Sequence, residues 1–250
     1  MIKDWWNIRY LDEAIRYVEV RSGKKEFGIR AIQADRIRYD LVHEWIQYCQ
    51  EQHDSECQNL HGQPPVTGLR VIDCHTRSVV SAPPGCRYVA LSYVWGDPPN
   101  PDPTSPTRFA PVVQDSITAA LALGYEYLRV DKHCINQGDS GDKHEQVSQM
   151  NAIYAVADLT FIAASGNSED DGLPGVGIKS RQPQEKIVVG DLTLTQGFCH
   201  LQPMLLKSKW ATRAWTFQEG CLSRRSLFFT DQQVYFACNG MYCAESVDSR

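Results

Sequence analysis

Apolar runs of strand length recur through the middle of the chain. The runs "YVALSYVWG" (88–96), "YLRVD" (127–131) and "LTFIAAS" (159–165) are each bounded by polar, glycine or proline residues. The first is apolar and aromatic almost without interruption, which is typical of a strand that is buried on both faces of a parallel sheet. We therefore predict three buried strands in this part of the chain.

Segments with helical patterns separate these strands. Asp115 is expected to cap a helix over "SITAALALG", which Gly124 would end. In "KHEQVSQMNAIYAVAD" (143–158), the residues Val147, Met150, Tyr154 and Ala157 form one helical stripe. The alternation of strand and helix predicts parallel βαβ units with right-handed crossovers.

Weaker patterns flank this region. Asp40 is expected to cap a helix that runs to about residue 57, and "GLRVID" (68–73) predicts a strand. A hairpin is predicted around Gly190-Asp191, and "SLFFTDQQVYFAC" (226–238) predicts two strands joined by a tight turn. We predict an α/β fold with added antiparallel strands, in which an N-terminal helical extension (1–65) packs on the main domain (66–250). The first twenty residues are amphipathic enough to dock on it.

Composition excludes several classes of protein. The chain has 250 residues, a formal net charge of -5 and no dense lysine and arginine block, which argues against a nucleic-acid partner. No apolar run is long enough to span a bilayer, and the N-terminus lacks a secretory signal. The nine scattered cysteines are therefore expected to be reduced thiols in a cytoplasmic protein.

A binding site is expected where the predicted parallel strands end. Ligands of such sheets bind beyond the carboxyl ends of the strands, where polar or small residues follow all three runs: Ser92 to Asp97, Asp131 to Gln137 and Ser165 to Gly172. These loops are rich in aromatic and hydrogen-bonding groups and poor in positive charge. They favour a ligand held by stacking and neutral polar contacts.

The segment "WATRAWTFQEG" (210–220) offers a candidate for chemistry. In a helix, Trp215 and Glu219 stand four residues apart and share one face, so that an acid lies beside an apolar slab. That face is either one wall of a pocket or ordinary core with a charge at its rim. In the second case Glu219 is a solvated helix residue or forms an ion pair with Arg213 or Arg224. The residues alone leave both readings open.

Several spaced motifs together resemble one family. They are "YVALSYVWGD", "LRVDKHCINQ" followed by "EQVSQMNAIYAVAD", then "DGLPG" and "RAWTFQE", which are similar in kind and order to the HET domain of fungal heterokaryon-incompatibility proteins. The resemblance covers roughly residues 88 to 245. The second motif departs from it, because Arg129, Lys132 and His133 stand where the family usually has aromatic, apolar or small residues. The resemblance implies a role in self/non-self recognition that triggers cell death.

HET domains are in turn similar to TIR domains, which implies a TIR-like, flavodoxin-like parallel sheet flanked by helices. "ALSYVWGD" resembles the first strand and loop of TIR domains, and "WTFQE" resembles the helix that carries the catalytic glutamate of NAD-cleaving members. By this resemblance Glu219 is the catalytic residue of an NAD glycohydrolase, with NAD or a related nucleotide as substrate and no cofactor. The residues expected to shape its pocket are Ser92, Tyr93, Trp95, Gly96, Asp131 and Trp215.

Other readings remain beside this one. The domain is alternatively a non-catalytic adaptor that self-associates or recruits a partner protein or additional domains, with Glu219 structural. Cys49, His53 and Cys57 recur every four residues, so that one helical face presents all three, with Cys74 or His75 as a candidate fourth zinc ligand. Because structural sites usually contain a closer pair such as C-x-x-C, we assign no metal at this stage and leave zinc open. A thiol hydrolase built on His133-Cys134 is disfavoured, since no partner acid is indicated.

Overall fold

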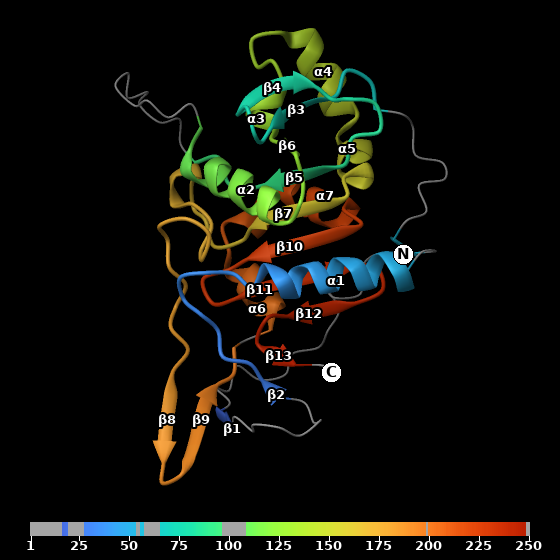
Figure 1. Ribbon diagram of the computed structural model, residues 1–250. Helices are drawn as coiled ribbons and strands as arrows, with labels where there is room; N and C mark the ends of the chain where they lie inside the picture. The colour runs from blue at the N-terminus through green and yellow to red at the C-terminus, as the bar shows by residue number, and fades with distance from the viewer. Residues whose placement is uncertain are drawn as a thin grey trace.

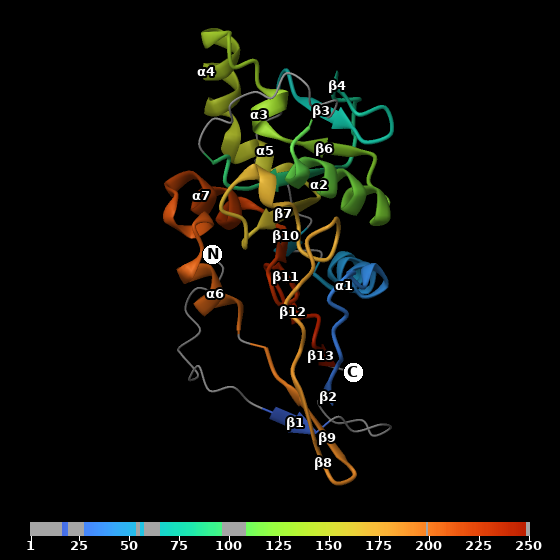
Figure 2. The same cartoon turned by 90° about the vertical axis from the view of Figure 1, so that its left-hand side faces the viewer.

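An eight-stranded sheet with helices on both faces organises the molecule (Figures 1 and 2). The computed structural model describes residues 17–19, 28–53, 56–57, 66–96, 109–198 and 200–248. Most of the amphipathic segment 1–20, whose docking we predict, lies outside these residues. Within them, no helix combines the length and the apolar character that crossing a membrane requires.

The four central strands of the sheet are parallel. They are β6 (Tyr127–Arg129), β5 (Tyr88–Ser92), β7 (Leu159–Ala163) and β10 (Arg225–Phe229), in this spatial order. The order reverses at β5, because the next strand of the chain lies on one side of it and the two later strands lie on the other. Every residue of β5, β7 and β10 is buried, which confirms the prediction of a parallel sheet covered on both faces.

Antiparallel strands extend the sheet at both edges. One edge carries β3 (Arg70–Asp73), which pairs with β6, and β4 (Ser78–Ser81). The other carries β11 (Val234–Cys238), which pairs with β10, and β12 (Tyr242–Ala244). The predicted antiparallel additions are thus confirmed.

A hairpin arm projects from the body of the molecule (Figure 1). It consists of β8 (Lys186–Val189) and β9 (Leu192–Gln196), joined at Gly190, and β1 (Tyr17–Glu19) pairs with β9. Gly190 has φ of +60°, a conformation that suits glycine in such a turn. A separate two-stranded pair joins β2 (Gly28–Ile29) to β13 (Val247–Asp248).

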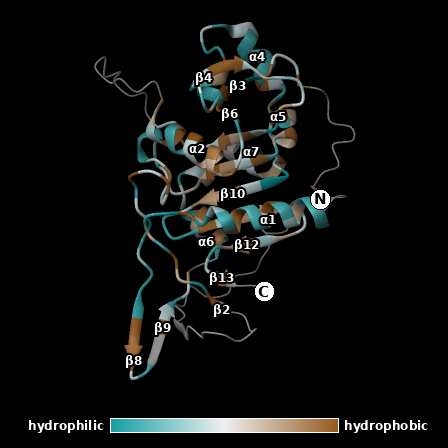
Figure 3. Ribbon diagram, in the orientation of Figure 1, coloured by the Kyte–Doolittle hydropathy of each residue, from teal (hydrophilic) through white to brown (hydrophobic). Residues whose placement is uncertain are grey.

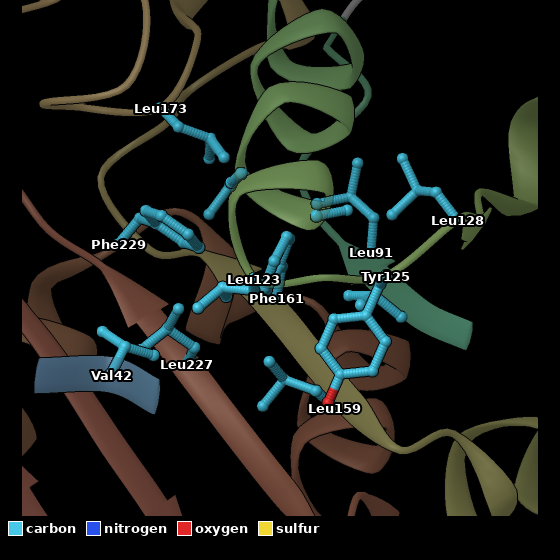
Figure 4. Packing of buried hydrophobic residues seen from close by; sticks show 14 of the residues in the cluster. Val42, Leu91, Leu123, Tyr125, Leu128, Leu159, Phe161, Leu173, Leu227 and Phe229 are labelled. Carbon is cyan, nitrogen blue, oxygen red and sulfur yellow. The ribbon is translucent and has the colours of Figure 1, made fainter. Parts of the chain in front are cut away.

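The helices divide between the two faces of the sheet (Figure 2). On one face, α1 (Tyr39–Gln52) and α2 (Pro111–Ala122) cover a core in which Val42 and Leu123 pack with Leu91, Phe161 and Leu227 (Figure 4). The other face is covered by α5 (Met150–Val156), α6 (Leu201–Lys207) and α7 (Ala214–Leu222). Between β6 and α5 lie α3 (Asp131–Cys134) and α4 (Ser140–Ser148). Two short 3₁₀ turns, η3 (Glu169–Asp171) and η4 (Trp210–Thr212), complete the described elements.

Three details of the sequence prediction are wrong at helix ends. Helix α2 begins at Pro111, whose fixed φ suits a first helical position, and Asp115 instead accepts a hydrogen bond from the Leu173 backbone N at 2.7 Å. Asp40 lies inside the first turn of α1, behind Arg38 as the N-cap. The helix expected over 143–158 is divided at Gln149, whose side-chain oxygen accepts a hydrogen bond from Thr67 N at 2.8 Å.

Candidate active site at the carboxyl edge of the sheet

A cavity of about 320 Å³ opens where the parallel strands β5 and β6 end. Its walls come from β5 and the loop after it, from the segment that follows β6, and from helices α4, α5 and α7. Of the residues expected from the sequence to form a site, the structure brings five together on these walls: Tyr93, Trp95, Asp131, Trp215 and Glu219. The position of the cavity is the one predicted for a ligand site of an open parallel sheet.

Glu219 lies in α7 and reaches back to the last residue of β5. The Ser92 hydroxyl donates a hydrogen bond to Glu219 Oε2 at 2.5 Å, and the same oxygen of Ser92 accepts one from Trp210 Nε1 at 2.8 Å. Because Ser92 has one hydroxyl proton, the indole N–H fixes its direction toward the carboxyl group. Ser92, which we expected in the binding set, is buried and does not line the cavity, although its hydroxyl bonds Glu219.

The surroundings of Glu219 stabilise its ionised form poorly. Burial raises its pKa to about 8, while the Ser92 hydrogen bond and the charge of Arg213 oppose this rise and the charge of Asp131 adds to it. Arg213 donates to the Tyr93 carbonyl oxygen at 3.2 Å, and Arg224 donates to the carbonyl oxygens of Val156 and Ala157. Because burial is the largest influence on its pKa, Glu219 is not the solvated helix residue that one alternative from the sequence describes.

A glycine next to Glu219 lets α7 approach the buried indole. A Cβ atom at Gly220 would lie 3.0 Å from Trp210 Cη2, closer than side chains normally pack. Trp210 is fully buried and comes from η4, just before α7. The two tryptophans of the segment 210–220 therefore differ: Trp210 supports the carboxyl group, and Trp215, 56% exposed, lies at the rim of the cavity.

Asp131 is the second acid of the cavity. Its Oδ1 accepts a hydrogen bond from Arg129 Nε at 3.1 Å, and its Oδ2 accepts one from the Tyr154 hydroxyl at 3.2 Å. Burial raises the pKa of Asp131, and the charge and hydrogen bond of Arg129 oppose that rise. Asp131 is the first residue of α3 and lines the cavity, and among the described residues its carboxylate accepts hydrogen bonds from the side chains of Arg129 and Tyr154.

The loop after β5 supplies aromatic side chains. Trp95 and Tyr93 line the cavity, and the buried Tyr93 hydroxyl has no hydrogen-bond partner among the described residues. Gly96, which we expected in the binding set, does not line it. Its φ is +81°, and a Cβ there would lie 2.9 Å from Ser168 Cβ, so glycine allows the loop to pass over that residue.

Other cavity residues were not singled out by the sequence. Tyr154 was placed on the apolar stripe of its helix, and nothing in that pattern shows that its hydroxyl faces Asp131. Lys143 and Arg213 give the cavity two cationic groups, in contrast to the expectation of little positive charge. The expected third loop, 165–172, does not line the cavity: its Glu169 instead holds the Lys132 ammonium group at 2.6 Å.

The three residues that depart from the family pattern have structural roles. Arg129 is buried, and besides Asp131 its guanidinium bonds Gln146 and the Arg70 carbonyl oxygen. Lys132 forms the ion pair with Glu169 described above. The His133 ring packs edge-on against Phe109, with ring centroids 4.9 Å apart. These contacts tie the segment after β6 to its surroundings.

Comparison with known proteins shows the family to which this chain belongs. Residues 88–219, just over half of the chain, match the family model described as "Heterokaryon incompatibility protein (HET)", and the chain therefore belongs to the HET family. It is 26% identical, over 236 residues, to heterokaryon incompatibility protein 6, OR allele, of Neurospora crassa, an alignment that covers 68% of this chain and 34% of that relative. The chain thus spans about a third of the length of that relative. No solved structure matches. The family predicted from the sequence is confirmed.

Proposed function

We propose that this chain is a heterokaryon-incompatibility effector domain that triggers cell death by hydrolysing NAD at the nicotinamide–ribose bond, with Glu219 as the catalytic residue. The observation that carries the proposal is a buried carboxyl group with a strongly raised pKa in the wall of a cavity at the carboxyl edge of a parallel sheet. Perturbed acids in such cavities are frequent at sites of catalysis.

The strand order supports a TIR-like assignment. Numbered along the chain, the central strands β6, β5, β7 and β10 have the spatial order 2-1-3-4, which is the order of flavodoxin-like sheets. Such sheets bind nucleotides beyond the carboxyl ends of the strands, near the strand at which the order reverses. Here that strand is β5, and its last residue, Ser92, bonds Glu219.

The chemistry needs one well-placed carboxylate. Loss of nicotinamide from the ribose passes through a transition state with oxocarbenium character, which a carboxylate stabilises by charge and by bonds to ribose hydroxyls. Nicotinamide leaves as a neutral molecule, so no strong general acid is required. In this proposal Trp95 and Trp215 stack on the ligand, Asp131 holds a ribose hydroxyl, and the Tyr93 hydroxyl gains the partner that it lacks among the described residues.

The volume of the cavity suits part of a dinucleotide. About 320 Å³ lies at the lower end of the range of ligand pockets, roughly 300–1,000 Å³. We infer that the nicotinamide riboside half of NAD enters and that the adenylate half lies outside. Lys143 and Arg213 are the cationic groups of the cavity available to the phosphates.

The protonation state of Glu219 sets an expected pH dependence. With a pKa of about 8 the free cavity holds mostly the neutral acid at pH 7, whereas the transition state needs the carboxylate. The value of kcat/KM should therefore rise with pH and level off above about pH 8. The positive nicotinamide ring favours the ionised acid, so the midpoint for kcat should lie lower.

The direct test is release of nicotinamide from NAD by the concentrated chain and by Glu219→Gln, which keeps the shape of the side chain. We expect the variant to lose activity by about a thousandfold or more, because the charge that stabilises the transition state is gone. Glu126→Gln, at an exposed position outside the cavity, is the matched control and should cleave normally. Equal rates for Glu219→Gln and the unmodified chain would show that Glu219 is not catalytic.

A second candidate function, a self-associating adaptor, is favoured by the hairpin arm. Strand β8 is exposed along its length, with Val188 at 70% and Val189 at 57%. Figure 3 shows that this exposed strand is hydrophobic. Among the described residues β8 pairs only with β9, so its other edge is open to another strand. If the chain cleaves no NAD at any concentration yet forms dimers that Val188→Lys abolishes in sedimentation experiments, the adaptor function replaces the catalytic one.

A further inference from the structure

Four side chains with metal-ligand atoms meet where the end of α1 lies close to the end of β11, and none of them lines the cavity described above. Cys49 lies in the last turns of α1, His53 and Cys57 follow it, and Cys238 ends β11. One ligand atom from each residue lies within 4.8 Å of the other three, and all but the half-buried His53 are buried. We propose that these residues bind a structural zinc ion as a Cys₃His site.

The distances suit tetrahedral coordination. Zinc bonds of about 2.3 Å to sulfur and about 2.0 Å to nitrogen place neighbouring ligand atoms roughly 3.5–3.8 Å apart. The Cys238 Sγ and His53 Nδ1 atoms are already 3.4 Å apart, and the widest separation in the set exceeds the tetrahedral value by about 1 Å. Small side-chain rotations therefore complete the site.

The groups around the sulfur atoms are those that zinc-bound thiolates need. Arg225 Nε donates to Cys49 Sγ at 3.2 Å, and the Gly240 backbone N donates to Cys238 Sγ at 3.4 Å. Three thiolates and one zinc ion carry a net charge of -1, which the buried Arg225 guanidinium balances in part. N–H donors of this kind orient metal-bound thiolates and stabilise their charge.

The backbone is also built to bring the two segments together. A Cβ atom at Gly240 would lie 2.7 Å from His53 Cγ, so only glycine leaves room for the imidazole ring against this turn. The Asn239 side-chain nitrogen donates to the Glu56 carbonyl oxygen at 2.7 Å, and Arg224 donates to the Cys57 carbonyl oxygen at 3.1 Å. The first bond joins the two segments that carry the ligands, and the second joins one of these segments to the residue that precedes β10.

The fourth ligand differs from the sequence expectation. Cys74 and His75 lie elsewhere in the fold, and Cys238, distant along the chain, takes that place. Three ligands precede the family-matched span 88–219 and the fourth follows it. The zinc ion therefore fastens α1 to β11 and joins the two flanks of the HET domain, which gives it a structural role in stability.

Metal analysis of the full chain tests this proposal. Chain produced in zinc-supplemented medium and purified under reducing conditions, without chelator, should contain about one zinc ion per molecule by mass spectrometry of the elements. Cys57→Ala and Cys238→Ala should retain less than about a tenth of that, because three ligands hold zinc poorly. His53→Cys should keep the metal, as a Cys₄ site. Cys74→Ala, at a buried thiol outside the set, is the matched control and should bind as the unmodified chain does.

The unmodified chain supplies a readout that does not depend on how the variants fold. Removal of zinc by a chelator should lower the thermal midpoint by about 10 °C, and zinc, but not magnesium, should restore it. Cobalt in place of zinc should show the visible bands of tetrahedral coordination and the ultraviolet band of thiolate ligation. The proposal would be overturned if the purified protein contained no zinc and showed no cobalt bands. It would also be overturned if dithiothreitol lowered the thermal midpoint and a chelator did not, since that result would indicate a disulfide. None of the four ligands lines the cavity, so loss of the NAD proposal leaves this test unaffected.

Discussion

Two buried carboxyl groups at opposite edges of the same sheet have opposite environments. Asp158 lies just before β7, at the amino edge, and accepts hydrogen bonds from Arg87 at 2.6 Å, the Tyr125 hydroxyl at 2.7 Å and Arg225 at 3.2 Å. Burial alone would raise its pKa, but the bonds and charges of these groups outweigh it and the pKa is lowered. Glu219, at the carboxyl edge, has the reverse balance and a pKa of about 8.

The difference distinguishes an acid with a structural role, Asp158, from an acid whose ionised form is disfavoured, Glu219. At the amino edge two guanidinium groups hold Asp158 ionised and lock neighbouring elements together. At the carboxyl edge Glu219 accepts a hydrogen bond from a serine hydroxyl and has a cavity beside it, and its ionised form is not favoured by its surroundings. An acid whose ionised form is disfavoured by its surroundings, and which lies next to a cavity, is better suited to chemistry than to stability.

The largest effect on stability should come from Asp158→Asn. The change removes the countercharge that Asp158 supplies to the buried Arg225 and its neighbours, and we expect the free energy of unfolding to fall by about 3–5 kcal/mol. Denaturant titration measures this loss. Asp231→Asn removes an acid from a surface ion pair with Lys179, 3.4 Å long, whose carboxylate side chain is 42% exposed, and should cost less than about 1 kcal/mol. Equal losses in the two variants would contradict the contrast between the edges.

Glu219→Gln should raise the free energy of unfolding, by an amount that depends on pH. A folded-state pKa of about 8, against an ordinary value of 4.5, means that the folded chain binds the proton more tightly. This contribution to stability is fully present below about pH 4.5 and is lost as the pH rises toward 8. We expect Glu219→Gln to exceed the unmodified chain in stability by roughly 2–4 kcal/mol at pH 8 and by little at pH 5.

Thermal and denaturant unfolding of both chains across this pH range provide the measurement. The difference between them isolates Glu219, because the other titrating groups are common to both. Glu126→Gln, the same substitution at an exposed position outside the cavity, is the control. A constant difference for Glu219→Gln would mean that the carboxyl group is solvated or fully paired in solution.

The contrast between the two edges was only partly accessible from the sequence. Buried runs such as 88–92 and 159–163 predict their strands because burial on both faces leaves no polar alternation, and the alternation of strand and helix predicts parallel strands joined by crossovers. The spacing of Trp215 and Glu219 predicts that they share a helix face, and in the structure both residues line the cavity. Regular local patterns were therefore sufficient to predict the strands and the helix face that carry the site residues.

Contacts between distant residues were not accessible in this way. The bond from Trp210 to Ser92 joins positions 118 residues apart, and Tyr154 and Asp131 meet across a helix and a loop. Helix ends also differed, because Pro111 begins α2 before the expected cap Asp115. Such pairings depend on how packed layers are oriented, which no local periodicity encodes.

A smaller loss of stability is expected when the packing of α7 against Trp210 is crowded. Gly220→Ala places a methyl group about 3.0 Å from the Trp210 ring, which must move away from Ser92. Overpacking of this kind costs about 1–3 kcal/mol, and the better helix propensity of alanine returns up to about 1 kcal/mol. Gly138→Ala, whose methyl group would lie 3.6 Å from its nearest neighbour, is the control and should be close to neutral. Equal stability of both variants would show that α7 yields freely at this point.

The finest test of the contrast is Ser92→Ala, which removes the nearest donor to Glu219 and enlarges the imbalance at the carboxyl edge. A hydrogen bond to an ionised acid is worth about 1.5 kcal/mol, so the pKa of Glu219 should rise further and the midpoint of kcat/KM against pH should move upward by about one pH unit. Ser116→Ala removes a buried hydroxyl that donates to the Val112 carbonyl oxygen at 2.7 Å, outside the cavity, and should leave the midpoint in place. A midpoint unchanged by Ser92→Ala but moved by Asp131→Asn would assign control of Glu219 to the charge of the neighbouring acid and not to the serine.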